Sequence, residues 1–250
     1  MDTTTDIDTT TTTTALVTGA NKGLGARTCR RLARLGWTVW LAARDTAAAE
    51  TTAADIRADQ PDADLRVVAL DVTSDASVGA AVETVTLAGT GLDVLVNNAG
   101  VAGEPVDTLE TTPAHFLPVY AVNLLGPVRV THAFLPLLTA SARPRLVMVS
   151  SGLGRLDLVN DPARPESSVP GLVYQSSKAA LFMVANQYAK ALPDVRVSAV
   201  DPGWTATDLN GHSGPQTVTE GTDAIVAAAS ADDVPGLVFD RDDLTAPLPV

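Results

Sequence analysis

Cysteine and lysine are scarce in this 250-residue sequence: there is one cysteine, Cys29, and there are three lysines, Lys22, Lys178 and Lys190. A single cysteine excludes an intramolecular disulfide and a cluster of thiolate metal ligands. The 17 lysines and arginines stand against 29 aspartates and glutamates, which gives a formal net charge of −12 at pH 7. Nucleic acids and anionic membrane surfaces bind clustered basic side chains, so the charge balance argues against both kinds of partner.

Long apolar segments are also missing. No uninterrupted apolar run reaches about 18 residues, so no membrane span is expected. The first 14 residues include nine threonines and three aspartates, a composition that predicts neither a signal peptide nor a transit peptide. Residues 1–12 are therefore expected to form a flexible tail, residues 13–250 a single domain, and the protein is expected in the cytoplasm. The three histidines are far apart, and no metal site is expected.

Short apolar segments alternate with longer segments of helical period through most of the chain. The expected strands are residues 15–18, 38–43, 65–70, 93–96, 145–149, 196–200 and 237–239, and the expected helices are 24–35, 46–58, 77–88, 112–140, 174–191 and 219–230. This alternation predicts an α/β fold: a single Rossmann-type doubly wound domain with a mostly parallel seven-stranded sheet and helices on both faces. Ligands of such sheets bind at the carboxyl ends of the strands. Three prolines in the helix at 112–140 predict kinks there.

A glycine-rich loop follows the first expected strand and leads into the first helix. Gly19, Gly23 and Gly25 permit a tight turn and a close approach of a diphosphate to the backbone, next to the positive end of the helix dipole. The spacing differs from that of the general dinucleotide fingerprint, and a tight turn without a ligand is the alternative. The position of the loop between strand and helix favours a dinucleotide site.

The end of the second strand distinguishes between the two nicotinamide cofactors. An NAD site carries a carboxylate there for the ribose 2′-hydroxyl, whereas this chain has Ala43 followed by Arg44. The Arg44 guanidinium can hold a 2′-phosphate, and Lys22 in the glycine loop can reach the same phosphate. The two cations together favour NADPH/NADP+, with a solvated strand-end charge as the alternative for Arg44. Asp45 is expected to cap the next helix.

Tyr174 and Lys178 lie four residues apart, on one face of an expected helix. A nearby cation favours the phenolate and lowers the pKa of a tyrosine, which can then exchange a proton with a carbonyl oxygen. A tyrosine and a lysine at this spacing are also common as a surface contact. Here, however, Ser150 and Ser151 end the fifth strand and an Asn-Asn-Ala-Gly segment ends the fourth, so hydroxyl and amide groups are expected beside the pair.

These motifs together resemble the short-chain dehydrogenases/reductases. The matches are the TGxxxGxG loop at 18–25, the Asn-Asn-Ala-Gly segment at 97–100, Ser151, the pair Tyr174 and Lys178, and Pro202 with Gly203 after the sixth strand. The resemblance runs from about residue 15 to residue 240. It implies a nicotinamide-dependent oxidoreductase with the predicted α/β fold.

Residue by residue, the resemblance implies a catalytic set of Asn123, Ser151, Tyr174 and Lys178. Tyr174 would donate the proton to the carbonyl, Lys178 would tune Tyr174 and bind the nicotinamide ribose, and Ser151 would orient the carbonyl. Asn123 would hold a water of a proton relay beside the lysine. The implied cofactor-binding residues are Gly19, Asn21, Lys22, Gly23, Leu24, Gly25, Arg44, Asp71, Val72, Asn98, Ala99, Gly100, Tyr174, Lys178, Pro202, Gly203 and Thr205, and no metal is implied.

Three segments, at 18–25, 43–45 and 202–208, look like those of the NADPH carbonyl reductases, including the menthone and salutaridine reductase type. Between Ser151 and Tyr174 lie 22 residues, more than in most members of the family. In the carbonyl reductase-like members such an insertion covers the helix face that others use to dimerise. A monomer is therefore expected, with a dimer or tetramer as the alternatives.

The functional hypothesis is an NADPH-dependent oxidoreductase that reduces a ketone or aldehyde, a small-molecule carbonyl substrate, by hydride transfer with Tyr174 as proton donor. One alternative is an NADP-dependent alcohol dehydrogenase that works oxidatively in a biosynthetic pathway. The other is a catalytically silent dinucleotide-binding protein, which the intact catalytic set argues against. Trp204, Leu153 and residues 209–216 are expected to border the substrate pocket.

Overall fold

The computed structural model describes residues 12–232 and 238–240. The strands are β1 Thr14–Thr18, β2 Thr38–Ala43, β3 Leu65–Ala69, β4 Val94–Asn97, β5 Arg145–Val149, β6 Arg196–Asp201 and β7 Val238–Asp240. The longer helices are α1 Gly23–Ala33, α2 Thr46–Asp59, α3 Asp75–Leu87, α4 Pro113–Tyr120, α5 Gly126–Thr139, α7 Val173–Ala191 and α9 Asp223–Ser230. The short helical segments are η1 Ala121–Leu125, η2 Gly152–Gly154, α6 Leu156–Val159, η3 Pro165–Ser168, η4 Asp208–Asn210 and α8 Val218–Gly221.

The seven strands form one sheet in the order β3-β2-β1-β4-β5-β6-β7. Every neighbouring pair is parallel, so the predicted doubly wound sheet is confirmed. The chain winds from β1 outward to β3 and then returns to the other side of β1 with β4. Because the winding direction reverses between β1 and β4, a crevice is expected at the carboxyl ends of these two strands.

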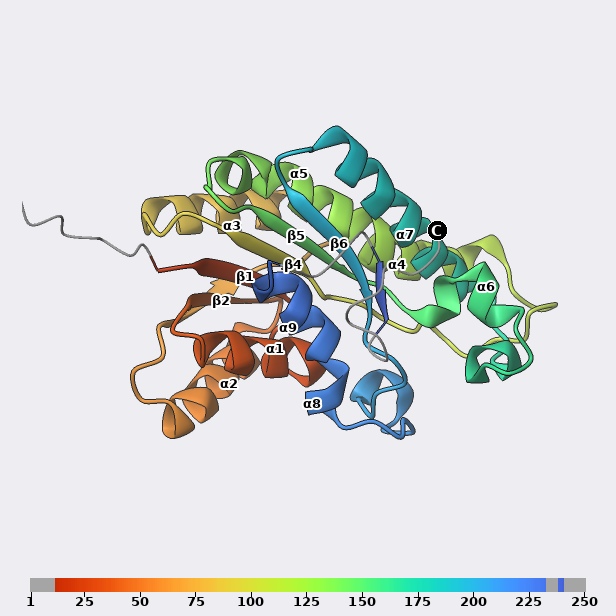
Figure 1. Cartoon of the computed structure of the whole chain (residues 1–250). Coiled ribbons are helices and arrows are strands. Elements are labelled where there is room, and N and C mark those ends of the chain that lie inside the picture. The colour runs from red at the N-terminus through yellow and green to blue at the C-terminus, as the bar shows by residue number, and fades with distance from the viewer. Residues whose placement is uncertain (1–11, 233–237, 241–250) are drawn as a thin grey trace, which may run out of the picture.

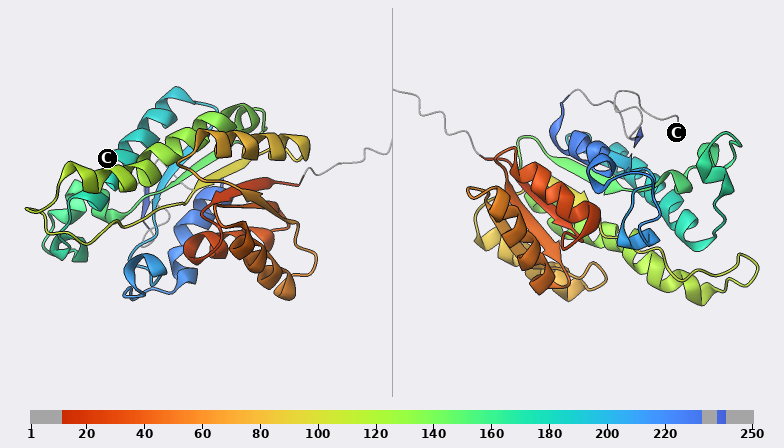
Figure 2. Two further views of the ribbon diagram at one scale, coloured as in Figure 1. Left: turned by 180° about the vertical axis from the view of Figure 1, so that it is seen from behind. Right: turned by 90° about the horizontal axis from the view of Figure 1, so that it is seen from below.

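Helices cover both faces of the sheet (Figure 1). α3, α5 and α7 lie on one face, and α1, α2 and α9 lie on the other, an arrangement that the two further views show as well (Figure 2). Successive residues of β1 point to opposite faces: Val17 packs in the core on the α1 side, whereas Leu16 packs in the core on the α5 side. Both layers are predominantly apolar, as a sheet covered on both sides requires.

The strand predictions agree closely with the structure, and β2 and β5 have the bounds expected from their apolar runs. The expected helix at 219–230 is divided, because α8 ends at Gly221 and α9 begins at Asp223. The tail predicted for residues 1–12 falls almost wholly outside the described residues. Residue Thr12, its last member, is exposed and precedes β1.

The expected helix at 112–140 contains a π-helical turn, η1, between α4 and α5. Pro127 has no N–H to donate to the carbonyl of Asn123, four residues earlier, so regular α-helical bonding is interrupted there. The helix therefore departs from α geometry just before one of its three prolines, whereas Pro118 and Pro136 lie inside α4 and α5.

The whole stretch Pro113–Thr139 has 27 residues and is long and apolar enough, by length and composition alone, to cross a membrane. The stretch contains Asn123 and Arg129, so it is not an uninterrupted apolar run of the kind considered from the sequence. Val130, Phe134 and Leu138 of α5 are fully buried against the sheet. The stretch thus packs as the core helix of an α/β domain, which passes the same test of length and composition.

Candidate active site

A cavity of about 940 Å³ opens at the carboxyl ends of the strands. Its lining comes from the segments that follow each of β1 to β6, which is where the fold predicts a ligand. All seventeen residues expected from the sequence to bind the cofactor line this cavity, and so does Ser151. Asn123, the remaining member of the expected catalytic set, does not.

The glycine loop after β1 is packed closely against the end of β4. Gly19 and Gly23 have positive φ angles of 64° and 55°, which glycine adopts without strain. A Cβ on Gly25 would lie 2.3 Å from the carbonyl oxygen of Gly19, so a side chain has no room there. The Asn98 amide donates to the carbonyl oxygen of Thr18 at 2.8 Å and fixes the two strand ends together.

The amino end of α1 faces the same cavity. Its N-cap residue, Lys22, makes no side-chain cap, and the first turn holds no acidic residue. Backbone N–H groups and the positive end of the helix dipole are therefore available to an anion. The glycine loop and this helix end form a cradle that fits a diphosphate.

Arg44, at the end of β2, and Asp71, after β3, line the far end of the cavity. Asp71 accepts hydrogen bonds from the backbone N–H and the hydroxyl of Thr73, and these bonds hold the pKa of its carboxyl below the usual value. Asp45 accepts from the backbone N–H of Ala48 at 3.0 Å, so its predicted role as a helix cap is confirmed. This end of the cavity thus presents the Arg44 guanidinium near the Asp71 carboxylate.

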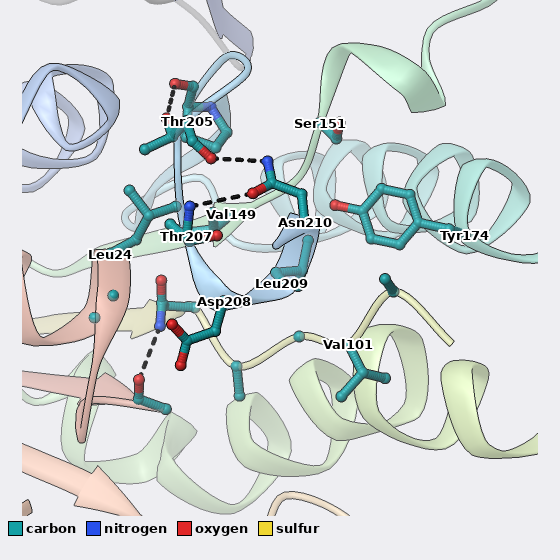
Figure 3. A pocket seen from close by; sticks show the side chains of 18 of the residues that line it. Leu24, Val101, Val149, Ser151, Tyr174, Thr205, Thr207, Asp208, Leu209 and Asn210 are labelled. Carbon is teal, nitrogen blue, oxygen red and sulfur yellow. Dashed lines mark hydrogen bonds between the residues drawn. The ribbon is translucent and has the colours of Figure 1, made fainter. Parts of the chain in front are cut away.

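Tyr174 and Ser151 meet on the opposite side of the cavity (Figure 3). Tyr174 is the second residue of α7, and its ring lies 5.7 Å from the ammonium nitrogen of Lys178, measured to the ring centroid. The Lys178 ammonium donates to the carbonyl oxygen of Val149 at 2.8 Å. Tyr174 and Lys178 therefore lie next to the end of β5, as the sequence predicted.

Burial controls the ionisation of this pair. It raises the pKa of Tyr174 to about 12, although the hydroxyl of Ser151 acts in the opposite direction. Burial also lowers the pKa of Lys178 to about 8, while the carboxylate of Asp201 opposes that change. The expected lowering of the tyrosine pKa is thus wrong, because loss of hydration outweighs the hydrogen bond with Ser151.

Asn123 lies in the π-turn η1 and is fully buried. Its amide donates to the carbonyl oxygen of Val101 at 2.9 Å and accepts from the backbone N–H of the same residue at 2.9 Å. It also donates to the hydroxyl of Ser177 on α7 at 3.1 Å. Asn123 therefore ties the segment after β4 to the helix that carries Tyr174 and Lys178.

Two carboxylates of the site were not identified from the sequence. Asp201 ends β6, is almost fully buried, and accepts from the backbone N–H of Gly203 at 3.0 Å. Glu166, in η3, lines the cavity close to Gly152. The position of Asp201 at a strand end was a usable signal, whereas the place of Glu166 depends on how the insertion folds.

Apolar side chains surround the mouth of the cavity beside Tyr174. Trp204 and Leu153 line it, as expected, and so do Leu209 and two of the residues that follow. Val101 and Val169 complete this rim from two other segments. Trp204 is 53% exposed, so the rim offers apolar surface to a ligand.

The segment between β6 and α8 lines the cavity and contacts the glycine loop. The Asn210 side chain donates to the carbonyl oxygen of Thr205 at 2.9 Å and accepts from the backbone N–H of Thr207 at 3.2 Å (Figure 3). The Lys22 ammonium, expected beside a phosphate, instead lies 2.7 Å from the carboxylate of Asp208. In the part of the chain that the structure describes, no group of three or more histidine, cysteine or acidic side chains could hold a metal ion.

A parallel doubly wound sheet, a glycine cradle and a tyrosine–lysine pair at one cavity define a dinucleotide-binding oxidoreductase. The family model described as short chain dehydrogenase matches residues 13–217. The chain belongs to the short-chain dehydrogenase/reductase family, and the resemblance stated from its motifs is confirmed.

Individual relatives fall in the expected subgroup. The chain is 32% identical to the (+)-neomenthol dehydrogenase of Arabidopsis thaliana, over 86% of this chain and 90% of that protein. The NADPH-bound carbonyl reductase from chicken fatty liver is 26% identical, with a TM-score of 0.80 over 92% of this chain and 97% of its own. Salutaridine reductase from Papaver somniferum is 26% identical, with a TM-score of 0.78 over 91% of this chain and 99% of its own.

Proposed function

We propose that this protein is an NADPH-dependent reductase of a ketone or aldehyde, with Tyr174 as the proton donor. The observation that carries the proposal is the meeting of Tyr174, Ser151 and Lys178 at one end of a cavity whose other end holds Arg44 and the glycine cradle. Similarity to an NADPH-bound carbonyl reductase supports the same reading.

The residues present fit an NADP(H) molecule. The cradle that a Cβ on Gly25 would fill accommodates a diphosphate, and Arg44 suits a 2′-phosphate because guanidinium binds phosphate in two-point geometry. No carboxylate takes the position after Ala43 that a 2′-hydroxyl requires. When bound, the reduced nicotinamide supplies the hydride.

The chain's own residues provide the proton and the orientation. Tyr174 is protonated at neutral pH, since burial raises its pKa to about 12, and can donate to a carbonyl oxygen. Ser151 lies beside it and can accept and pass on a hydrogen bond to the same oxygen. Lys178 carries a positive charge below about pH 8, which stabilises the tyrosine oxygen as its proton leaves. Asn123 acts on this set by fixing α7 against the segment at Val101.

The apolar rim supports an apolar carbonyl substrate. Trp204, Leu209 and Val169 present exposed apolar surface at the mouth next to Tyr174. A bulky apolar ketone would cover these side chains on binding, and each Å² removed from water contributes about 25 cal/mol. The oxidative direction, as an NADP-dependent alcohol dehydrogenase, uses the same residues in reverse and is the second candidate function.

The test is NADPH oxidation against a panel of aldehydes and ketones, with wild type and Tyr174→Phe compared. The variant should lose about 10²–10⁴-fold in kcat, the usual contribution of a general acid, and should bind NADPH with nearly unchanged affinity. Full activity in Tyr174→Phe would refute the mechanism. A wild type that binds NADPH but reduces no member of the panel, and with NADP+ oxidises none of the corresponding alcohols, would favour the catalytically silent alternative.

A further inference from the structure

The ion pair between Lys22 and Asp208 joins two segments that are 186 residues apart in the sequence. Lys22 belongs to the glycine loop, and Asp208 opens η4 in the segment between β6 and α8. Both side chains line the cavity, and both are more than half exposed. The Thr207 side chain also approaches the place that a Cβ on Gly23 would occupy, to about 4 Å. The two segments therefore meet over the cradle.

The Asp208 carboxylate is held by its own segment. One oxygen pairs with Lys22, while the other lies 2.9 Å from the Nε2 atom of His212. Gly211 and His212 both have positive φ angles, 60° and 61°, and this turn brings the imidazole back onto Asp208. Figure 3 shows the Asp208 carboxylate pointing away from Tyr174, toward the side of the cavity where Leu24 lies. Asp208 is thus the fixed partner, and the long Lys22 side chain is the adaptable one.

The position of Lys22 gives its ammonium a second anionic partner. Lys22 and Arg44 both line the cavity, from the segments that follow the neighbouring strands β1 and β2, and both are cations that a 2′-phosphate could bind. A phosphate monoester carries a charge of about −1.5 to −2 at pH 7, more than a carboxylate. The ammonium pairs with Asp208 at 2.7 Å, and sharing its three donors with a phosphate would bring two anions close together, which their like charges oppose.

We propose that Asp208 is a specificity-determining residue that competes with the cofactor's 2′-phosphate for Lys22. The inference rests on the proposed function in one respect, because it needs a 2′-phosphorylated cofactor. NADPH takes Lys22 and releases the segment 205–213 from the glycine loop. NADH has no 2′-phosphate and leaves the ion pair intact. The segment that carries Leu209 to the substrate rim thus responds to the phosphate at the other end of the cavity.

The experiment measures the dissociation constants of NADPH and NADH by titration of tryptophan fluorescence or by calorimetry, at low ionic strength. Asp208→Asn keeps the shape of the side chain and removes its charge. Because exposed ion pairs are weak, the variant should bind NADPH about two- to fivefold more tightly, with NADH binding unchanged. Asp62→Asn is the matched control, since Asp62 is an exposed acid in the turn between α2 and β3 and its loss changes the net charge equally. It should alter neither constant.

A second background isolates the ion pair. In Lys22→Met, the further change Asp208→Asn should leave NADPH affinity where Lys22→Met alone puts it. Weaker NADPH binding by Asp208→Asn would overturn the inference, as would equal tightening of both cofactors or tightening that persists without Lys22. If the wild type prefers NADPH but Asp208→Asn binds NADPH with unchanged affinity, the competition is refuted while the proposed cofactor stands. A wild-type preference for NADH would refute the proposed cofactor and this inference with it.

Discussion

Lys178 is an ammonium that is almost fully buried in the wall of the cavity. The residue is only 4% exposed, and its ammonium donates a hydrogen bond to the carbonyl oxygen of Val149. Burial disfavours the charged form, which is why the pKa of Lys178 falls to about 8. The folded protein at neutral pH therefore carries a positive charge that has lost its hydration, and this loss lowers the free energy of unfolding.

Replacement of Lys178 by methionine should therefore stabilise the protein while it abolishes activity. A pKa lowered from 10.5 to about 8 corresponds to about 3 kcal/mol against folding at pH 7, and the unpaired Val149 carbonyl left behind costs about 1 kcal/mol. The free energy of unfolding of Lys178→Met should thus rise by about 2 kcal/mol at pH 7, as measured by urea denaturation.

The sign of the pH dependence gives a second check on the same variant. Between about pH 8 and 10.5 the unfolded chain still binds the lysine proton and the folded chain does not, so wild-type stability recovers across this window. The advantage of Lys178→Met should shrink by pH 10. Lys190→Met, a change at an exposed lysine of the same helix, should show neither effect. Equal or lower stability of Lys178→Met at pH 7 would contradict the argument.

Which residues form the site could be predicted from the sequence, but how they ionise and pair could not. Motif spacing brought Tyr174, Lys178 and Ser151 to one place, because parallel strands end at one edge of a sheet. The tyrosine pKa depends on burial by surrounding segments, which no i to i+4 spacing records. The ion pair of Lys22 with Asp208 could not be predicted either, because the two residues are far apart in the sequence.

At the scale of elements, apolar runs marked the strands well, since a buried parallel strand is apolar on both faces. β2 and β5 were bounded correctly for that reason. The π-turn at Ala121–Leu125 was missed because one extra residue in a helix hardly disturbs the hydrophobic period. The helical segments of the insertion, α6 and η3, pack mainly on η2 and on each other, through contacts that the sequence does not display.

The same packing bears on the oligomeric state. The insertion was expected to cover the helix face used for dimerisation, but α6 sits beyond the end of α7 and not along it (Figure 1). The monomer stays a prediction.

The glycine cradle allows a prediction with an internal control. In Gly25→Ala the new Cβ would meet the backbone oxygen of Gly19, and overpacking of this kind costs about 1–3 kcal/mol. Gly79→Ala, inside α3, would meet nothing within 4 Å and should stabilise by about 0.5–1 kcal/mol. Thermal unfolding of the two variants should therefore shift in opposite directions. Gly25→Ala should also lose cofactor affinity, whereas Gly79→Ala should keep it.

At the scale of the whole molecule, the net charge of −12 is offset locally. Several aspartates are paired with arginine, lysine or hydroxyl partners that hold the pKa of their carboxyls below the usual value. These are Asp64, Asp71, Asp157, Asp208 and Asp232. An acidic protein can therefore offer a cation-lined groove to an anionic cofactor, because the cations lie where the ligand binds.

These aspartates predict the response to acid. Each has a lower pKa in the folded protein than in the unfolded chain, so its stabilising effect is complete above the unfolded value of 3.8 and is lost as pH falls below it. The melting temperature should be nearly level from about pH 5 to pH 7 and fall steeply below about pH 4. A melting temperature at pH 3.5 equal to that at pH 7 would contradict the prediction.

The parallel sheet has two edges with different roles, one at the carboxyl ends of the strands and one at their amino ends. The segments that follow strands supply the lining of the cavity, whereas the turns that precede strands, at 34–37, 60–64, 88–93, 140–144 and 192–195, contribute nothing to it among the described residues. A label, an affinity tag or a surface anchor inserted at 60–64 or 88–93 would thus affect the stability of the fold and leave the cavity lining unchanged. The same insertion at 98–112 or 202–217 would change what the enzyme binds. The turns at the amino ends of the strands can therefore carry labels or tags, while the segments at the carboxyl ends can be changed to alter substrate binding.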